Sequence, residues 1–159
     1  MRPQNCVTCY GWIKEPLSFV LEYCERGELR MILDDREAYA KIPRATSVKL
    51  AWGAAKGLRY LHDRGMLHRD IKSLNIFVTR AFEAKLGDFG LSEIKRGIGA
   101  TQAATSLGNT PAWTCPEFKP KLYNTKCDVY SFGVVLWEIG TRLFPFKGKD
   151  PIEVLKEVV

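Results

Sequence analysis

The sequence of 159 residues predicts an α+β fold, in which a short β-hairpin precedes a mainly helical region. The stretch Ser18–Tyr23 is rich in aromatic and β-branched residues and lies between Pro16 and Gly27, as is typical of a strand. Two longer stretches, Thr46–Asp63 and Lys126–Ile139, carry the apolar patterns of helices. Strands that precede a run of helices indicate an α+β protein.

The first part of the chain is expected to form the hairpin. Cys6–Ile13 supplies the partner of the strand at 18–23, and the turn between them is placed near 14–16, because proline favours turns. A short helix is predicted from Glu28 to Leu33.

The helix predicted at 46–63 has the clearest pattern. Thr46 or Ser47 can cap its start, and Gly65 fits the position just past its end. The small residues Ala51 and Ala55 allow a neighbouring element to approach closely. The residues expected to face the core recur at helical spacing, and they are Leu50, Ala54, Leu58 and Leu61.

Beyond this helix, two short strands are predicted at 75–78 and 84–86, joined by a tight connection. Residues 91–109 are rich in Gly, Ala, Thr and Ser and lack sustained periodicity, which is typical of a functional loop. The helix at 126–139 is apolar on nearly every face, so we expect it to be buried all round. A last helix is predicted at 152–159.

Composition argues against several classes of function. The hydrophobic content of 46% is that of a globular protein, and we expect neither a membrane span nor a signal peptide. The net charge of +6 comes from scattered basic residues, so nucleic acid is not an expected partner. Five cysteines without framework spacing predict reduced thiols in the cytosol. Cys6 and Cys9 are interpreted as ordinary thiols, because His62 and His68 are the only histidines and no second pair completes a zinc site.

The most informative feature is the stretch 68–75 together with the later Asp88-Phe89-Gly90. Asp70 can take a hydroxyl proton, and Lys72 can hold a phosphate. Asn75 and Asp88, brought together by a hairpin, can hold Mg²⁺ by oxygen ligands. In order and spacing the two motifs resemble the catalytic loop and metal loop of eukaryotic protein kinases.

The resemblance covers nearly the whole chain and implies a protein-kinase-like fold. Residues 1–21 would end the small lobe, 22–28 would form the hinge, and 29–159 would form most of a mainly helical large lobe. ATP and Mg²⁺ are the implied cofactors. The residues implied to contact nucleotide are Leu21 before the hinge, Glu22 and Cys24 through their backbones, Glu28 at the ribose and Phe77 beneath the adenine.

Other residues match positions that regulate or support the active site in the family. Arg69 would pair with a phosphate on the activation segment, added by an upstream kinase or by self-phosphorylation. The candidate phosphorylation sites are Thr101, Thr105 and Ser106. Thr110 would bridge Asp70 and Lys72. The residues implied to be structural are His68 packed beside Phe89, Glu117 paired with an arginine near the end of the domain, and Asp128 holding the backbone of the catalytic loop.

The implied activity is transfer of the ATP γ-phosphate to a serine or threonine of a protein, since Lys72 and Thr110 follow that pattern. Residues 131–138 resemble the tyrosine-kinase-like group, near mixed-lineage, dual-leucine-zipper and receptor-interacting kinases. The implied location is the cytoplasm, or the cytoplasmic side of a membrane receptor. Two alternatives stay open: a pseudokinase or scaffold that signals by conformation, and a small-molecule phosphotransferase.

The family's Gly-rich loop, and the lysine and glutamate that position the ATP phosphates, have no counterpart in the sequence, which we expect to be truncated at both ends. These 159 residues alone are therefore expected to be nearly inactive. Glu117 without its partner arginine would be an uncompensated buried charge that costs about 3–5 kcal/mol, so marginal stability is expected as well.

Overall fold

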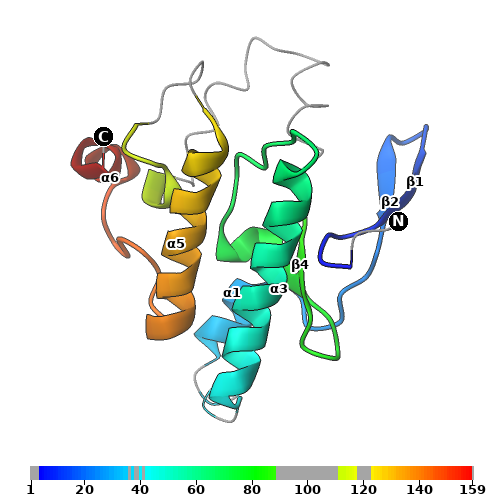
Figure 1. Ribbon diagram of the computed structural model, residues 1–159, viewed down its shortest axis with the longest axis horizontal. Coiled ribbons are helices and arrows are strands. Elements are labelled where there is room, and N and C mark those ends of the chain that lie inside the picture. The colour runs from blue at the N-terminus through cyan, green and yellow to red at the C-terminus, as the bar shows by residue number, and fades with distance from the viewer. Residues whose placement is uncertain are drawn as a thin grey trace.

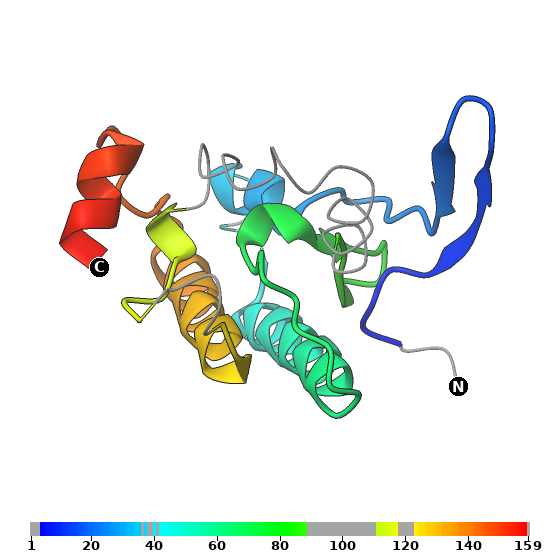
Figure 2. The ribbon, with the colours of Figure 1, turned by 90° about the horizontal axis from the view of Figure 1, so that it is seen from above.

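The computed structural model describes residues 4–35, 37, 40, 42–88, 111–117 and 123–158, and it confirms the α+β class. The chain opens with β1 (Cys9–Ile13) paired antiparallel with β2 (Ser18–Leu21). This hairpin lies to one side of the molecule, away from the helices (Figures 1 and 2). The predicted hairpin is therefore confirmed, with shorter strands than expected.

The helices form the body of the protein (Figure 1). They are α1 (Leu29–Asp34), α3 (Arg44–His62), α5 (Thr125–Thr141) and α6 (Pro151–Val158). The long helices α3 and α5 lie side by side in both ribbon views. No helix in the described part of the chain is long and apolar enough to cross a membrane.

The two ends of α3 show where local chemistry does and does not predict a boundary. The helix begins at Arg44, after Pro43, and no side chain caps it, so the predicted cap at Thr46 or Ser47 is wrong. Its C-terminal end confirms Gly65: this residue has a left-handed φ of 68°, and its N–H bonds to the His62 carbonyl at 2.9 Å.

A second hairpin packs against α3. The 3₁₀ turn η1 (Ser73–Asn75) leads into β3 (Ile76–Val78), which pairs antiparallel with β4 (Ala84–Leu86). The helix and β4 approach closely because α3 presents glycines there: a Cβ at Gly57 would lie 3.1 Å from Leu86 Cγ, and a Cβ at Gly53 would lie 3.3 Å from Ala84 Cβ. The four predicted core positions of α3 are all buried, as are β3 and β4 residues opposite them.

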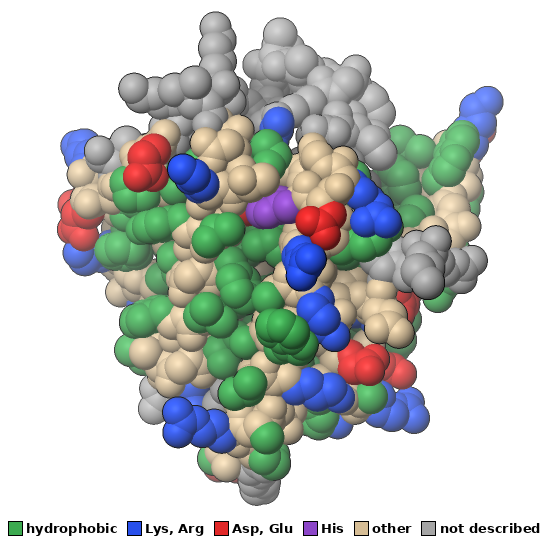
Figure 3. Space-filling model, viewed as in Figure 1, with side chains coloured by type: hydrophobic (Ala, Val, Ile, Leu, Met, Phe, Trp, Pro, Cys, Tyr) green, Lys and Arg blue, Asp and Glu red, His purple; other side chains and the backbone are tan. Residues whose placement is uncertain are grey.

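Helix α5 corrects one prediction. It buries one face, through residues such as Ser131 and Val135, but Val129 and Trp137 are 56% and 42% exposed. It is therefore not buried all round, because within this chain α3 and η3 (Pro111–Trp113) cover only part of its circumference. Figure 3 shows apolar side chains gathered on the face over α3 and α5.

Candidate active site

The carboxylate of Asp70 is held by two side chains of its own loop. Lys72 Nζ lies 2.9 Å from Asp70 Oδ2, and Asn75 Nδ2 donates to the same oxygen at 2.8 Å. The Asn75 amide also donates to the Asp70 carbonyl at 2.7 Å. The Asp70 side chain is 31% exposed, so a hydroxyl arriving from solvent can reach a carboxylate whose orientation is already fixed.

The second hairpin brings Asn75 close to Asp88. Ile76 pairs with Leu86, so the residues one step outward, Asn75 and Gly87, also face each other. The Gly87 N–H donates to the Asn75 carbonyl at 2.9 Å. Asp88 follows at once, is exposed, and has a left-handed φ of 61°, which turns the chain out of the strand.

The oxygen donors at this point are of the chemical kind that Mg²⁺ prefers. The amide nitrogen of Asn75 is committed to Asp70, which leaves its Oδ1 as a ligand atom. Asp88 adds an exposed carboxylate one residue beyond the Asn75–Gly87 bond. Mg²⁺ is commonly bound by one or two such side chains together with substrate phosphates.

His68 connects the two loops from inside the core. It is fully buried, and its Nε2 lies 3.0 Å from the Gly87 carbonyl, while the Asp70 N–H points to its Nδ1 at 3.3 Å. Burial lowers the pKa of His68, so the ring is neutral, with its hydrogen on Nε2 and the lone pair on Nδ1. The imidazole thereby fixes the loop 68–75 relative to Gly87, the residue that precedes Asp88.

Asp128, at the start of α5, holds the backbone of the loop 68–75. It is fully buried and accepts N–H bonds from His68 at 3.0 Å and Arg69 at 2.9 Å. Tyr123 Oη and His62 Nε2 contact the same carboxylate at 2.7 and 2.8 Å. Burial alone would raise the pKa of Asp128, but these hydrogen bonds outweigh it and hold the pKa below its ordinary value. His62 therefore has a role that the sequence did not indicate.

Arg69 is strained by this arrangement. Its φ of 68° lies in the left-handed region, which non-glycine residues rarely adopt. The bond to Asp128 keeps it there. Its Nε is buried without a hydrogen-bond partner among the described residues.

Two of the residues expected to contact nucleotide, Glu28 and Phe77, meet at β3. Glu28 forms an isolated antiparallel bridge with Phe77, and the Val78 N–H donates to the Gly27 carbonyl at 2.9 Å. The Phe77 ring lies so close to Gly87 that a Cβ at Gly87 would be 2.5 Å from it. Residues 27 and 28 are thereby joined to the strand that follows Asn75.

Glu22, the residue after β2, forms an ion pair with Lys85 of β4. Lys85 Nζ lies 2.6 Å from Glu22 Oε1, and the Thr8 N–H donates to Glu22 Oε2 at 3.1 Å. Burial of Glu22 opposes its ionisation, but the hydrogen bonds from Lys85 and Thr8 outweigh it and lower its pKa. Among the described residues no hydrogen bond engages the Glu22 carbonyl or the Cys24 N–H. Cys24 is buried, and Leu21 ends β2 with 44% of its area exposed.

Several predicted residues fall outside the part of the chain that the structure describes: Phe89, Thr101, Thr105, Ser106 and Thr110. Glu117 is described, and it corrects the expectation of a buried unpaired charge. Its side chain is exposed, so water compensates the carboxylate and the expected cost of about 3–5 kcal/mol does not arise.

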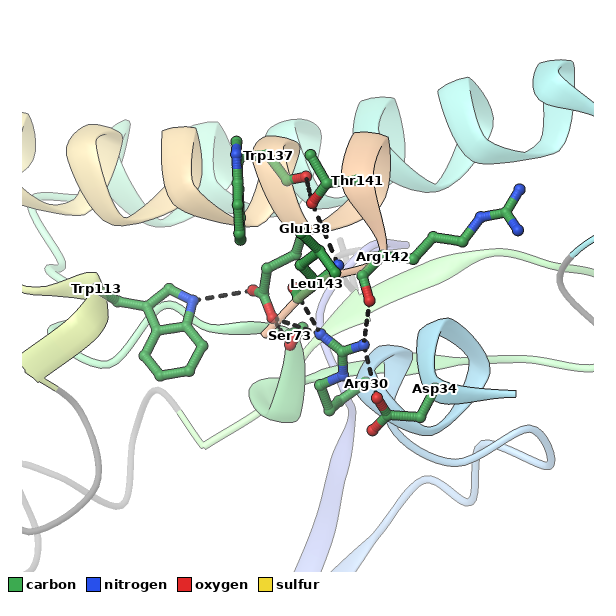
Figure 4. A network of polar contacts seen from close by, with 9 residues as sticks. All are labelled: Arg30, Asp34, Ser73, Trp113, Trp137, Glu138, Thr141, Arg142 and Leu143. Atoms are coloured by element: carbon green, nitrogen blue, oxygen red, sulfur yellow. Dashed lines mark hydrogen bonds and ion pairs between the residues drawn. The ribbon is translucent and has the colours of Figure 1, made fainter. Parts of the chain in front are cut away.

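A buried network around Glu138 was not predicted (Figure 4). Its carboxylate accepts from Ser73 Oγ at 2.6 Å, from Trp113 Nε1 at 2.9 Å and from Arg30 Nη1 at 3.1 Å. These partners come from η1, η3 and α1, so one carboxylate of α5 ties η1, in the loop 68–75, to α1, η3 and α5. The available signal was a carboxylate inside an otherwise apolar helix, which must find partners when it is buried.

Comparisons with known proteins agree with this geometry. The family described as protein tyrosine and serine/threonine kinase matches residues 1–159. The chain is 41% identical over 154 residues to the serine/threonine/tyrosine-protein kinase HT1 of Arabidopsis thaliana, covering 94% of this chain and 38% of the relative. It is 42% identical over 160 residues to the probable serine/threonine-protein kinase drkA of Dictyostelium discoideum, covering 98% of this chain and 24% of the relative.

A third relative is the serine/threonine-protein kinase CTR1 of Arabidopsis thaliana, 37% identical over 163 residues, covering 99% of this chain and 20% of the relative. The chain thus spans less than two-fifths of the length of these relatives. The family model matches the full length of the chain, and the loops that carry Asp70 and Asp88, with Asp128 supporting the first of them, agree with that match. The chain belongs to the family of protein tyrosine and serine/threonine kinases.

Proposed function

We propose that this chain is the core of an ATP-dependent serine/threonine protein kinase. The observation that carries the proposal is the fixed carboxylate of Asp70, 2.9 Å from Lys72 Nζ and 2.8 Å from Asn75 Nδ2. In this layout residues 1–21 end a small lobe, 22–28 form the hinge and 29–159 belong to the large lobe. The separate β1–β2 hairpin supports that division (Figure 1).

Asp70 orients the hydroxyl of the protein substrate and accepts its proton as the bond from the hydroxyl oxygen to the γ-phosphorus forms and the bond from that phosphorus to ADP breaks. The transition state is loose, so the position of this carboxylate matters more than its basicity. The Lys72 ammonium has three hydrogens, of which one points to Asp70, and the others can contact the γ-phosphate.

The nucleotide is proposed to bind along residues 21–28 and β3. The Glu22 carbonyl and Cys24 N–H hydrogen-bond adenine, Leu21 borders the pocket, Phe77 lies beneath the ring, and Glu28 contacts the ribose. Asn75 and Asp88 hold Mg²⁺, which neutralises charge on the phosphates when bound.

Activation is proposed to depend on a phosphate that pairs with Arg69. The buried Nε of Arg69, without a hydrogen-bond partner among the described residues, supports this. Phosphorylation of Thr101, Thr105 or Ser106 by an upstream kinase, or by the protein itself, would supply the charge. Thr110 is proposed to bridge Asp70 and Lys72.

The substrate is proposed to be a serine or threonine in a protein, and the wider group the tyrosine-kinase-like kinases, near the mixed-lineage, dual-leucine-zipper and receptor-interacting kinases. We place the protein in the cytoplasm or on the cytoplasmic side of a membrane. The names of the relatives support serine and threonine, and one of them also includes tyrosine. Identification of the phosphorylated amino acid in the product distinguishes these.

The test is phosphorylation of a generic Ser/Thr peptide by the full-length protein with Mg²⁺ and ATP. Asp70→Asn is expected to lower kcat by about 10²–10⁴-fold. Asp63→Asn is the matched control, because that carboxylate is 60% exposed and its one ion pair among the described residues is with the exposed Arg59. A wild-type protein that binds ATP without transferring phosphate would indicate a pseudokinase, and transfer only to small molecules would also refute the proposal.

A further inference from the structure

We propose that Cys115 and Cys127 form a dithiol site that a hydroperoxide oxidises to an intramolecular disulfide. Their sulfur atoms lie 2.6 Å apart, about half an ångström beyond the covalent S–S length of roughly 2.05 Å. Both are free thiols in this structure and both are buried. The inference does not depend on the proposed kinase activity.

The backbones that carry the two thiols are already fixed relative to each other. Cys115 follows η3 by two residues, and Cys127 lies in the first turn of α5, a helix that packs against η3. One hydroxyl, Ser131 Oγ, lies 2.6 Å from the Trp113 carbonyl and 3.0 Å from the Cys127 carbonyl. Since Glu138 also anchors Trp113, closing the S–S bond requires a shift of the side chains and little movement of the backbone.

The other cysteines differ in their surroundings. All five lie in described residues, and no sulfur–sulfur contact is found between any other two of them. Cys6 and Cys24 are buried, and Cys9 is exposed. An oxidant the size of hydrogen peroxide is therefore expected to produce one intramolecular disulfide, while Cys9 reacts separately with solvent reagents.

One sulfur, as thiolate, attacks the O–O bond of the hydroperoxide, which gives a sulfenic acid and releases an alcohol, or water from hydrogen peroxide. The second sulfur attacks the sulfenic sulfur, so that the S–S bond forms and the S–O bond breaks, with the hydroxyl leaving as water. Two electrons pass from the sulfurs to the peroxide, and the two thiol protons end in the products.

Burial sets the conditions for the test. Burial, together with the hydrogen bond to Cys127, raises the pKa of Cys115 to about 12, so its thiolate is scarce near neutral pH. Oxidation is therefore carried out at pH 8.5, where a larger fraction of the thiol is ionised than at neutral pH. The full-length protein is treated with hydrogen peroxide. Remaining thiols are alkylated in denaturant, and the peptides are analysed by mass spectrometry.

The expected result is a linked pair of peptides containing Cys115 and Cys127, lighter than the free pair by two hydrogen atoms and separated by dithiothreitol. Cys9→Ser should form the same link, and Cys127→Ser should leave Cys115 available for alkylation. The proposal is overturned if both thiols stay alkylatable at peroxide doses that oxidise Cys9. It is equally overturned if each becomes a separate sulfinic acid or pairs with another cysteine. The wild-type result decides the question even if Cys127→Ser does not fold.

Discussion

Replacing Glu138 with alanine is expected to destabilise the protein strongly. The carboxylate is fully buried and accepts three hydrogen bonds, so the substitution leaves Ser73 Oγ and Trp113 Nε1 without their acceptor. It also removes the buried partner of Arg30, whose side chain is 4% exposed. Arg30 keeps Asp34 at 2.8 Å, but that carboxylate is 68% exposed and compensates only part of the charge.

The magnitude follows from these contacts. Breaking a buried ion pair by removing one partner costs about 3–5 kcal/mol, and each unsatisfied buried donor costs about 1–3 kcal/mol. Because Arg30 keeps Asp34 and two backbone carbonyls, we expect a total loss of about 3–5 kcal/mol rather than the full sum. That is a large share of a typical stability of about 5–15 kcal/mol.

The assay is urea unfolding followed by circular dichroism, with the slope of the transition checked for constancy. The matched control is Glu157→Ala, since Glu157 pairs with Lys149 on the surface, where the side chains are 49% and 46% exposed. The control should change stability by less than about 1 kcal/mol. If Glu138→Ala and Glu157→Ala cost the same, the reasoning about the buried network is wrong.

Three further outcomes follow. Gly87→Ala should cost about 1–3 kcal/mol in urea unfolding and weaken ATP binding, because its methyl would lie 2.5 Å from the Phe77 ring; unchanged binding would contradict the placement of that ring. Gly140→Ala, where a Cβ meets open space on a helix, should instead stabilise by up to about 1 kcal/mol; a loss would be contrary to this. Asp128 has a depressed pKa, so its contribution to stability is complete above the unfolded value near 3.9 and is lost as pH falls through the folded value. The difference between wild type and Asp128→Asn should therefore shrink only below about pH 4, and a difference that persists unchanged into strong acid would count against this.

Features set by neighbouring residues could be predicted from the sequence. Gly65 ends α3 as predicted, because its left-handed φ and its bond to His62 are local chemistry. The β3–β4 hairpin was predicted from short apolar runs, and its register follows from the tight connection at 79–83. That hairpin in turn places Asn75 beside Gly87, which is the residue before Asp88.

Features set by distant residues could not be predicted. His62 binds Asp128, 66 residues away, and Arg30 reaches Glu138 across 108 residues. No local pattern specifies such partners. The expectation that α5 is buried all round was wrong for a related reason, because apolar character alone does not determine whether another element covers a face. Glu117 was taken as buried from the family resemblance, whereas its exposure depends on which elements surround it.

The central claim is that Asn75 and Asp88 hold a divalent cation against a nucleotide whose phosphate is aimed toward Asp70. The most direct measurement is calorimetric titration of ATP into the full-length protein, with and without Mg²⁺, for wild type and Asp88→Asn. We expect Mg²⁺ to tighten ATP binding at least about tenfold in wild type, which is about 1.4 kcal/mol, and to have little effect in the variant. An equal effect of Mg²⁺ on both proteins would contradict the account.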